Sequence, residues 1–117
     1  MSAPDIETIT AKIREFRDAR DWAQFHNPKD MAIAISIEAS ELLEHFLWKN
    51  PEETASRVET HRTKIEEEVA DIAIYLFELA DNLGIDLKSA MERKLARNAE
   101  KYPVEKAKGS NAKYSEL

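Results

Sequence analysis

Two pairs of carboxylates stand at matching positions in two helical stretches. Glu38 and Glu41 are three residues apart, and so are Glu68 and Asp71. Residues at that spacing lie on one face of a helix, one turn apart. Four carboxylates turned inward from two helices repel one another and lose hydration, unless a cation lies between them. Because oxygen ligands are typical of hard divalent cations, the two pairs predict a site for Mg²⁺, with Mn²⁺ as a substitute.

Both pairs interrupt apolar stripes that should face a core. At 100° per residue, Glu38 and Glu41 share an arc with Ile35 and Leu42, and the second pair shares one with Ile65, Ile72 and Leu79. The alternative is that the acids lie at the stripe edges and face water, as most helical glutamates do. Two such pairs, each within an apolar stripe, favour the inward orientation and the metal site.

Composition indicates one helical domain spanning residues 1–117. The chain has 43% hydrophobic and 34% charged residues, with only two glycines and four prolines, so long helices are favoured over tight turns. A net charge of −6 argues against a nucleic-acid surface. The absence of cysteine excludes disulfides, a thiolate nucleophile and a zinc–thiolate site. No apolar run approaches membrane-spanning length, so we expect no membrane partner and a cytoplasmic protein.

The apolar periodicity predicts an all-α fold, most economically an antiparallel four-helix bundle. Asp5, Asn27 and Asp86 are expected N-caps, Asn50-Pro51 is a break, and Gly84 ends the third helix. Residues 52–63 are polar and expected to be exposed and helical in part. Residues 104–117 are expected to form an extended tail. The four predicted helices span residues 5–20, 28–48, 64–83 and 86–102.

The second predicted helix is apolar on more than one face. Ile33, Ile37, Leu43 and Leu47 lie outside its core-facing stripe. A second apolar face is typical of a buried central helix or of a subunit interface. We therefore expect a homodimer or a homotetramer.

A carboxylate site within a helical bundle suggests two chemistries. The di-iron type needs Glu-x-x-His on two helices, and the sequence contains no such motif, so that hypothesis fails. The second is a magnesium site acting on a polyphosphate. Phosphates also need cations, and Lys94, Asn98 and Lys101 lie on one face of the fourth helix, followed by Tyr102. A run of this kind is also common on a solvated helical surface.

Aromatic residues gather in the connection between the first two helices. Trp22, Phe25 and His26 either plug one end of the bundle or line a pocket, and the residues alone leave both possibilities open. For the chemistry, Glu41 is the candidate general base, with Glu38 nearly as good and Glu44 a weaker third. His45 is expected to be a packed or surface histidine, because hard-metal sites prefer oxygen ligands.

In their order and spacing, these motifs resemble the MazG-like nucleotide pyrophosphohydrolases, most closely the dCTP pyrophosphatase branch. The resemblance covers nearly the whole chain. Either acidic pair alone is weak evidence, whereas their combination with an Asn-x-x-Lys-Tyr-Pro segment is specific. The matching stretches are residues 20–26, the two acidic pairs with Trp48, residues 84–87, residues 94–103 and residues 113–117.

The resemblance implies Mg²⁺-dependent hydrolysis of a nucleoside triphosphate between the α and β phosphates, in nucleotide-pool clean-up. It implies Glu38, Glu41, Glu68 and Asp71 as metal ligands and Glu41 or Glu38 as the catalytic base. The favoured substrate would be dCTP or a modified pyrimidine deoxynucleotide. Ile13 stands where that branch would have a histidine, so base selectivity does not follow directly. The implied substrate-binding residues are Trp22, His26, Trp48, Lys94, Asn98, Lys101 and Tyr102.

The alternative is a non-catalytic helical oligomerisation module. Its acids would then form inter-helix ion pairs or a structural cation site, and no nucleotide would be hydrolysed.

Overall fold

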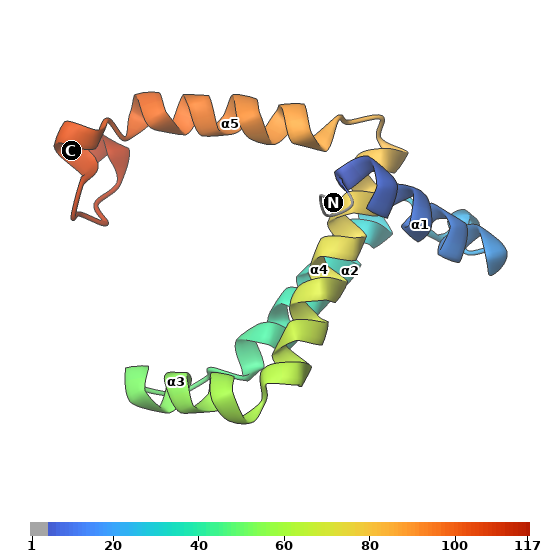
Figure 1. Cartoon of the computed structure of the whole chain (residues 1–117), viewed down its shortest axis with the longest axis horizontal. Helices are drawn as coiled ribbons and strands as arrows, with labels where there is room; N and C mark the ends of the chain where they lie inside the picture. Colours follow the sequence, from blue (N-terminus) through green and yellow to red (C-terminus); the bar gives the residue numbers. More distant parts are fainter. Residues whose placement is uncertain (1–4) are drawn as a thin grey trace. The chain divides into compact units, whose positions relative to one another are not determined.

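The structure is a computed structural model that describes residues 5–117 (Figure 1). These residues form six α-helices and two 3₁₀ turns, with no strand among them, so the predicted all-α class is confirmed. None of the helices in this range is long and apolar enough to cross a membrane. The chain forms two compact units, one up to Gly84 and one from Ile85 to Leu117.

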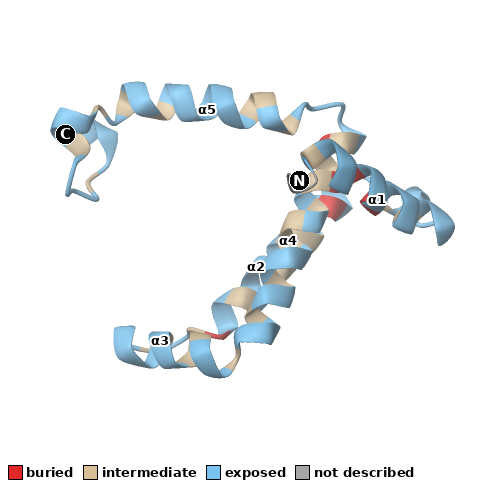
Figure 2. Ribbon diagram, in the orientation of Figure 1, coloured by how far each residue is buried: buried red, intermediate tan, exposed pale blue. Residues whose placement is uncertain are grey.

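The first unit is organised around its longest helix. Figure 1 shows α2 and α4 side by side, and α1 and α3 also contact α4. Among the described residues, buried hydrophobic side chains are few, namely Ile13, Met31 and Ala80, from α1, α2 and α4 (Figure 2). The elements of this unit are α1 (Ile6–Ala19), the 3₁₀ turn η1 (Ala23–Phe25), α2 (Pro28–Glu44), α3 (Pro51–Thr60) and α4 (Arg62–Asn82).

The predicted helix caps are present. Each cap side chain accepts a hydrogen bond from a backbone N–H of the first turn, which satisfies a donor that the helix itself leaves free. Gly84, at φ 68°, follows the end of α4 in a left-handed conformation that suits glycine. The cap contacts are Asp5 with Thr8 N at 2.8 Å, Asn27 with Asp30 N at 2.9 Å and Asp86 with Ser89 N at 3.1 Å.

The predicted helix 28–48 is shorter in the structure, and a separate helix follows it. After Glu44 the backbone tightens into turns, and Trp48 adopts a left-handed conformation at φ 62°. Asn50 and Glu53 then form a capping box that begins α3 at Pro51. The polar stretch expected to be helical in part is therefore a distinct helix, and six α-helices replace the four predicted.

The second unit contains α5 (Leu87–Lys101), the short α6 (Val104–Ala107) and a 3₁₀ turn at Tyr114–Glu116. The segment expected to be an extended tail is thus partly helical. The Tyr114 ring lies 4.9 Å from Lys101 Nζ and 6.1 Å from the Tyr102 ring, so the end of the chain packs onto the end of α5. The single domain and the antiparallel packing of the helices into a bundle stay predictions.

Candidate active site

A cavity of about 680 Å³ in the first unit contains both acids and aromatic side chains. Glu38 of α2 and Asp71 of α4 line it, as do Trp22 and His26 from the connection between α1 and α2. The volume falls in the range of small-molecule sites. Its other lining residues are Ile9, Lys12, Ile13, Phe16, Arg17, Phe25, Ile74, Tyr75 and Glu78. Trp22 and His26 therefore line a pocket.

The four predicted metal ligands interact electrostatically across α2 and α4. Burial raises the pKa of the Glu38 carboxyl above its usual 4.5, and the side chain of Glu41 and the charges of Glu41, Asp71 and Glu68 raise it further. Carboxylates this close favour protonation or a bound cation. Within residues 5–117, no group of three or more His, Asp or Glu side chains is arranged so that it could hold a metal ion in the single chain.

Glu68 is held by a buried histidine. His45 Nδ1 accepts a hydrogen bond from Arg57 Nε at 3.1 Å, so the ring proton lies on Nε2, which is 2.6 Å from Glu68 Oε2. That oxygen is buried and makes no hydrogen bond of regular geometry in the described part of the chain. His45 is buried as expected, and it also positions one of the candidate ligands. The remaining need of Glu68 Oε2 for a partner suits a cation.

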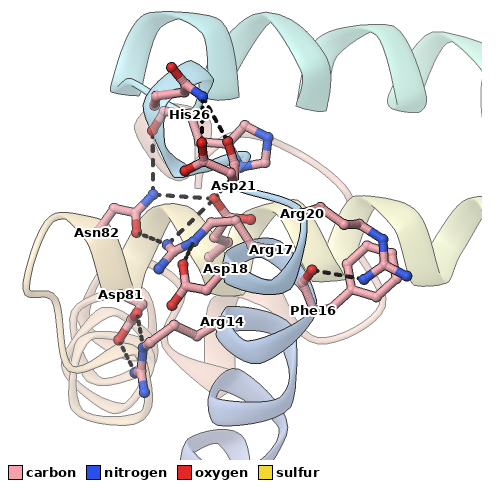
Figure 3. Close-up of polar contacts among 11 residues, drawn as sticks. Arg14, Phe16, Arg17, Asp18, Arg20, Asp21, His26, Asp81 and Asn82 are labelled. Atoms are coloured by element: carbon pink, nitrogen blue, oxygen red, sulfur yellow. Dashed lines mark hydrogen bonds and ion pairs between the residues drawn. The ribbon is translucent and has the colours of Figure 1, made fainter.

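A second acid of α4 is buried among hydrogen-bond donors and one cation. Glu78 is 4% exposed, and its Oε2 lies 2.6 Å from His26 Nδ1, 3.3 Å from Asn82 Nδ2 and 3.9 Å from a guanidinium nitrogen of Arg17. Arg17 also donates to Asn82 Oδ1 at 2.8 Å, and Asn82 donates to the backbone oxygen of His26 at 3.4 Å (Figure 3). These contacts join α1, α4 and the aromatic connection at one point.

Tyr75 links the two groups of acids. Burial, followed by the negative charges of Glu38, Asp71 and Glu78, raises the pKa of its phenol above the usual 10.0. The phenol therefore stays protonated at neutral pH and remains a hydrogen-bond donor beside the cavity. Sequence reasoning missed Tyr75, Glu78 and Arg17 as site residues. A signal existed on α4, because polar residues recur every three or four positions at 68, 71, 75, 78 and 82.

The other predicted site residues lie outside this cavity. Trp48 is 97% exposed after α2 and does not line this cavity. Lys94, Asn98, Lys101 and Tyr102 belong to the second unit, on α5 and just after it. Ile13, the position without the expected histidine, is buried and lines the cavity as an apolar side chain. The assignments of catalytic, metal and substrate roles stay predictions.

Comparison with known proteins gives one consistent result. Residues 33–117 match the MazG-like family. The chain is 39% identical to dCTP pyrophosphatase 1 of Bos taurus, over 99% of this chain and 70% of that protein, and 37% identical to its Homo sapiens counterpart, over 97% and 68%. A crystal structure of a pyrophosphatase from Archaeoglobus fulgidus superposes with a TM-score of 0.82 at 40% identity, covering 88% of this chain and 96% of that one.

The all-α fold and the carboxylate-lined cavity thus define a chain of the pyrophosphatase type. This chain belongs to the MazG-like family. The family prediction made from the sequence is confirmed, and the names of the relatives agree with the predicted pyrophosphohydrolase activity.

The repulsion between the carboxylates around Glu38 predicts that, without metal, the stability of the fold depends on pH. A carboxyl whose pKa is higher in the folded than in the unfolded chain destabilises the fold once the pH exceeds its folded pKa. Glu38→Gln should therefore raise the melting temperature in a chelator at about pH 7.5, and the gain should vanish as the pH falls below the usual carboxyl value. Thermal unfolding followed by circular dichroism at several pH values measures this difference. Glu44→Gln, an exposed change on the same helix, is the control, and an equal gain in both variants would contradict the prediction.

Proposed function

We propose that this chain is a Mg²⁺-dependent nucleotide pyrophosphohydrolase that converts dCTP, or a related pyrimidine deoxynucleotide, to the monophosphate and pyrophosphate. One observation carries the proposal: a single cavity is lined by acids of both predicted pairs and by aromatic rings. The aromatic surfaces suit a base, and the acids suit a metal that binds phosphates. The relatives named dCTP pyrophosphatase 1 support this substrate.

The residues present fit a hard divalent cation. Their donors are carboxylate oxygens, the charges of the other three acids raise the pKa of Glu38, and Glu68 retains a buried oxygen without a regular hydrogen bond. Glu38, Glu41, Glu68 and Asp71 would hold Mg²⁺, or Mn²⁺ in its place. When bound, the metal neutralises the charge of the phosphates and lowers the pKa of bound water.

The chain's own side chains then have definable tasks. Glu41, which is exposed, accepts the proton of the attacking water, or Glu38 does so. The water oxygen forms a bond to the α-phosphorus, the bond from that phosphorus to the bridging oxygen breaks, and pyrophosphate leaves with the electron pair. Trp22 offers a stacking surface to the base, and Tyr75 donates a hydrogen bond within the same cavity.

The remaining predicted contacts are retained in the proposal. Lys94, Asn98, Lys101 and Tyr102 serve the phosphates or the sugar, and Trp48 serves the base. The proposal also retains the cytoplasmic location expected from the sequence and the task of nucleotide-pool clean-up.

Assembly into a homodimer or homotetramer completes the proposal. Four apolar side chains of the second face of the α2 segment are exposed in the single chain: Ile33, Ile37, Leu43 and Leu47. A contiguous apolar surface of this kind is typical of a face that another copy covers.

A substrate panel tests the reaction. The purified chain is incubated with deoxynucleoside and nucleoside triphosphates and Mg²⁺ in ¹⁸O-labelled water. Attack at the α-phosphorus predicts labelled dCMP and unlabelled pyrophosphate, with no diphosphate product, by mass spectrometry. Absence of hydrolysis with both Mg²⁺ and Mn²⁺ would favour the non-catalytic module instead.

Removal of one metal-binding carboxylate should abolish turnover. Glu41→Gln and Asp71→Asn keep side-chain volume but lose a charged oxygen ligand, so kcat should fall by on the order of 10²-fold or more. Circular dichroism checks that the helices remain. Glu67→Gln, an exposed change on α4 outside both acidic pairs, should keep full activity. Full activity in both amide variants would refute the assignment of the four acids as metal ligands.

If a second copy of the chain covers the second face of α2, the molar mass in solution should exceed that of the monomer. Light scattering at micromolar protein should give a dimer or tetramer, and Ile37→Glu should shift the mass toward the monomer because a charge cannot be buried there cheaply. Lys29→Glu, an exposed change at the start of α2, is the control. A strictly monomeric mass for the unaltered chain contradicts the assembly.

A further inference from the structure

We propose that Glu78, positioned by His26 and Arg17, determines base specificity by accepting a hydrogen bond from the exocyclic amino group of cytosine. The inference rests on the proposed function, because it names the group of the substrate that this end of the cavity recognises. It concerns a residue outside the four acids of the predicted metal site.

Glu78 has the features of a recognition group rather than a solvated glutamate. Its side chain is 5% exposed, and all of its polar contacts within residues 5–117 are made by Oε2. Oε1 has no hydrogen-bond partner in that range, yet the residue lines the cavity. A carboxylate oxygen that no side chain of the protein donates to remains available as an acceptor, so a ligand in the cavity that brings an N–H to it gains a hydrogen bond to a charged group.

His26 extends the same pattern of acceptors. A carboxylate only accepts hydrogen bonds, so the 2.6 Å contact with Glu78 Oε2 places a proton on His26 Nδ1. In the neutral ring, Nε2 then has a lone pair and no proton. His26 Nε2 and Glu78 Oε1 are therefore two hydrogen-bond acceptors, and the two side chains offer no donor to a ligand.

The position of Glu78 along α4 suits the base end of a nucleotide. Asp71, in the acidic group, and Glu78 are seven residues apart, or about 10 Å along the helix axis. Trp22 lies close to His26, with ring centroids 6.5 Å apart, so an aromatic surface borders the acceptors. The residue at position 13, where a histidine was expected, is apolar Ile13 and offers no hydrogen bond. Glu78 and His26 are therefore the acceptors that lie beside the aromatic surface at this end of the cavity.

The chemistry distinguishes cytosine from uracil and thymine. Cytosine carries an amino group with two N–H donors at position 4, where uracil and thymine carry a carbonyl oxygen. A carbonyl facing Glu78 Oε1 would set two acceptors against each other, and no hydrogen bond could form between them. A site built for a hydrogen bond rejects the analogue that lacks it by large factors.

The first experiment uses the unaltered chain. Calorimetric titration with dCMP, dUMP and 2′-deoxyzebularine monophosphate compares an amino group, a carbonyl and a hydrogen at the same ring position. We expect dCMP to bind at least about tenfold more tightly than the other two. In hydrolysis, kcat/KM for dCTP should exceed that for dUTP by on the order of 10²-fold.

The second experiment inverts the hydrogen-bonding pattern. In Glu78→Gln the side-chain oxygen accepts the proton of His26, and the amide NH₂ takes the position of Oε1, so a donor replaces an acceptor. The ratio of kcat/KM for dCTP to that for dUTP should fall by on the order of 10²-fold, with an absolute gain on dUTP. Asp81→Asn is the matched control, because Asp81 lies on α4, is paired with Arg14 of α1 at 2.7 Å and does not line the cavity (Figure 3).

The outcomes separate this inference from the proposed function. Hydrolysis of dCTP with equal efficiency on dUTP, or an unchanged ratio in Glu78→Gln, overturns the role of Glu78 and leaves the reaction standing. Selective binding of dCMP without hydrolysis of any triphosphate refutes the reaction and supports the recognition. Equal affinities for the three monophosphates overturn the inference even where the variant fails to fold.

Discussion

The contact between α2 and α4 places two opposed demands on the same surface. Apolar side chains of both helices hold the first unit together, while carboxylates at the same interface raise the pKa of Glu38. Few hydrophobic side chains of this unit are fully buried, so the repulsion acts against a modest core. A divalent cation between the helices would turn that repulsion into a link between them. Binding of a metal and the stability of the contact between α2 and α4 are therefore coupled.

The acids of α4 differ in how their charge is balanced. Glu78 has the Arg17 guanidinium and a hydrogen bond from His26, both from other segments, so the chain itself stabilises its charge. Glu68 has the buried His45, which Arg57 orients. Asp71 has no ion pair within residues 5–117 and contributes to the raised pKa of Glu38. The end of the cavity near Asp71 therefore needs an external cation, whereas the end near Glu78 does not.

Local signals predicted much of this structure from sequence. The caps at Asp5, Asn27 and Asp86 depend on a few neighbouring residues, and all three are confirmed. The division of the predicted helix 28–48 depends on a left-handed residue at Trp48, which its side chain does not favour and the sequence did not reveal. Two partners of Glu78, His26 and Arg17, come from positions 52 and 61 residues away, so no local pattern identifies them. The spacing of polar residues along α4 indicates which way the Glu78 side chain points. It does not indicate which charged groups of other segments lie next to that side chain.

Trp48 combines two unfavourable features in the single chain. A bulky residue at φ 62° is strained by about 1–3 kcal/mol, and its ring is 97% exposed to water. Neither feature is explained by a contact within residues 5–117, although the capping box of α3 fixes the chain immediately after it. A strained and exposed aromatic ring gains free energy when it meets another surface, either a base or a second copy of the chain. Because the exposed Leu43 and Leu47 precede it, the covering of this face and the use of Trp48 are physically coupled.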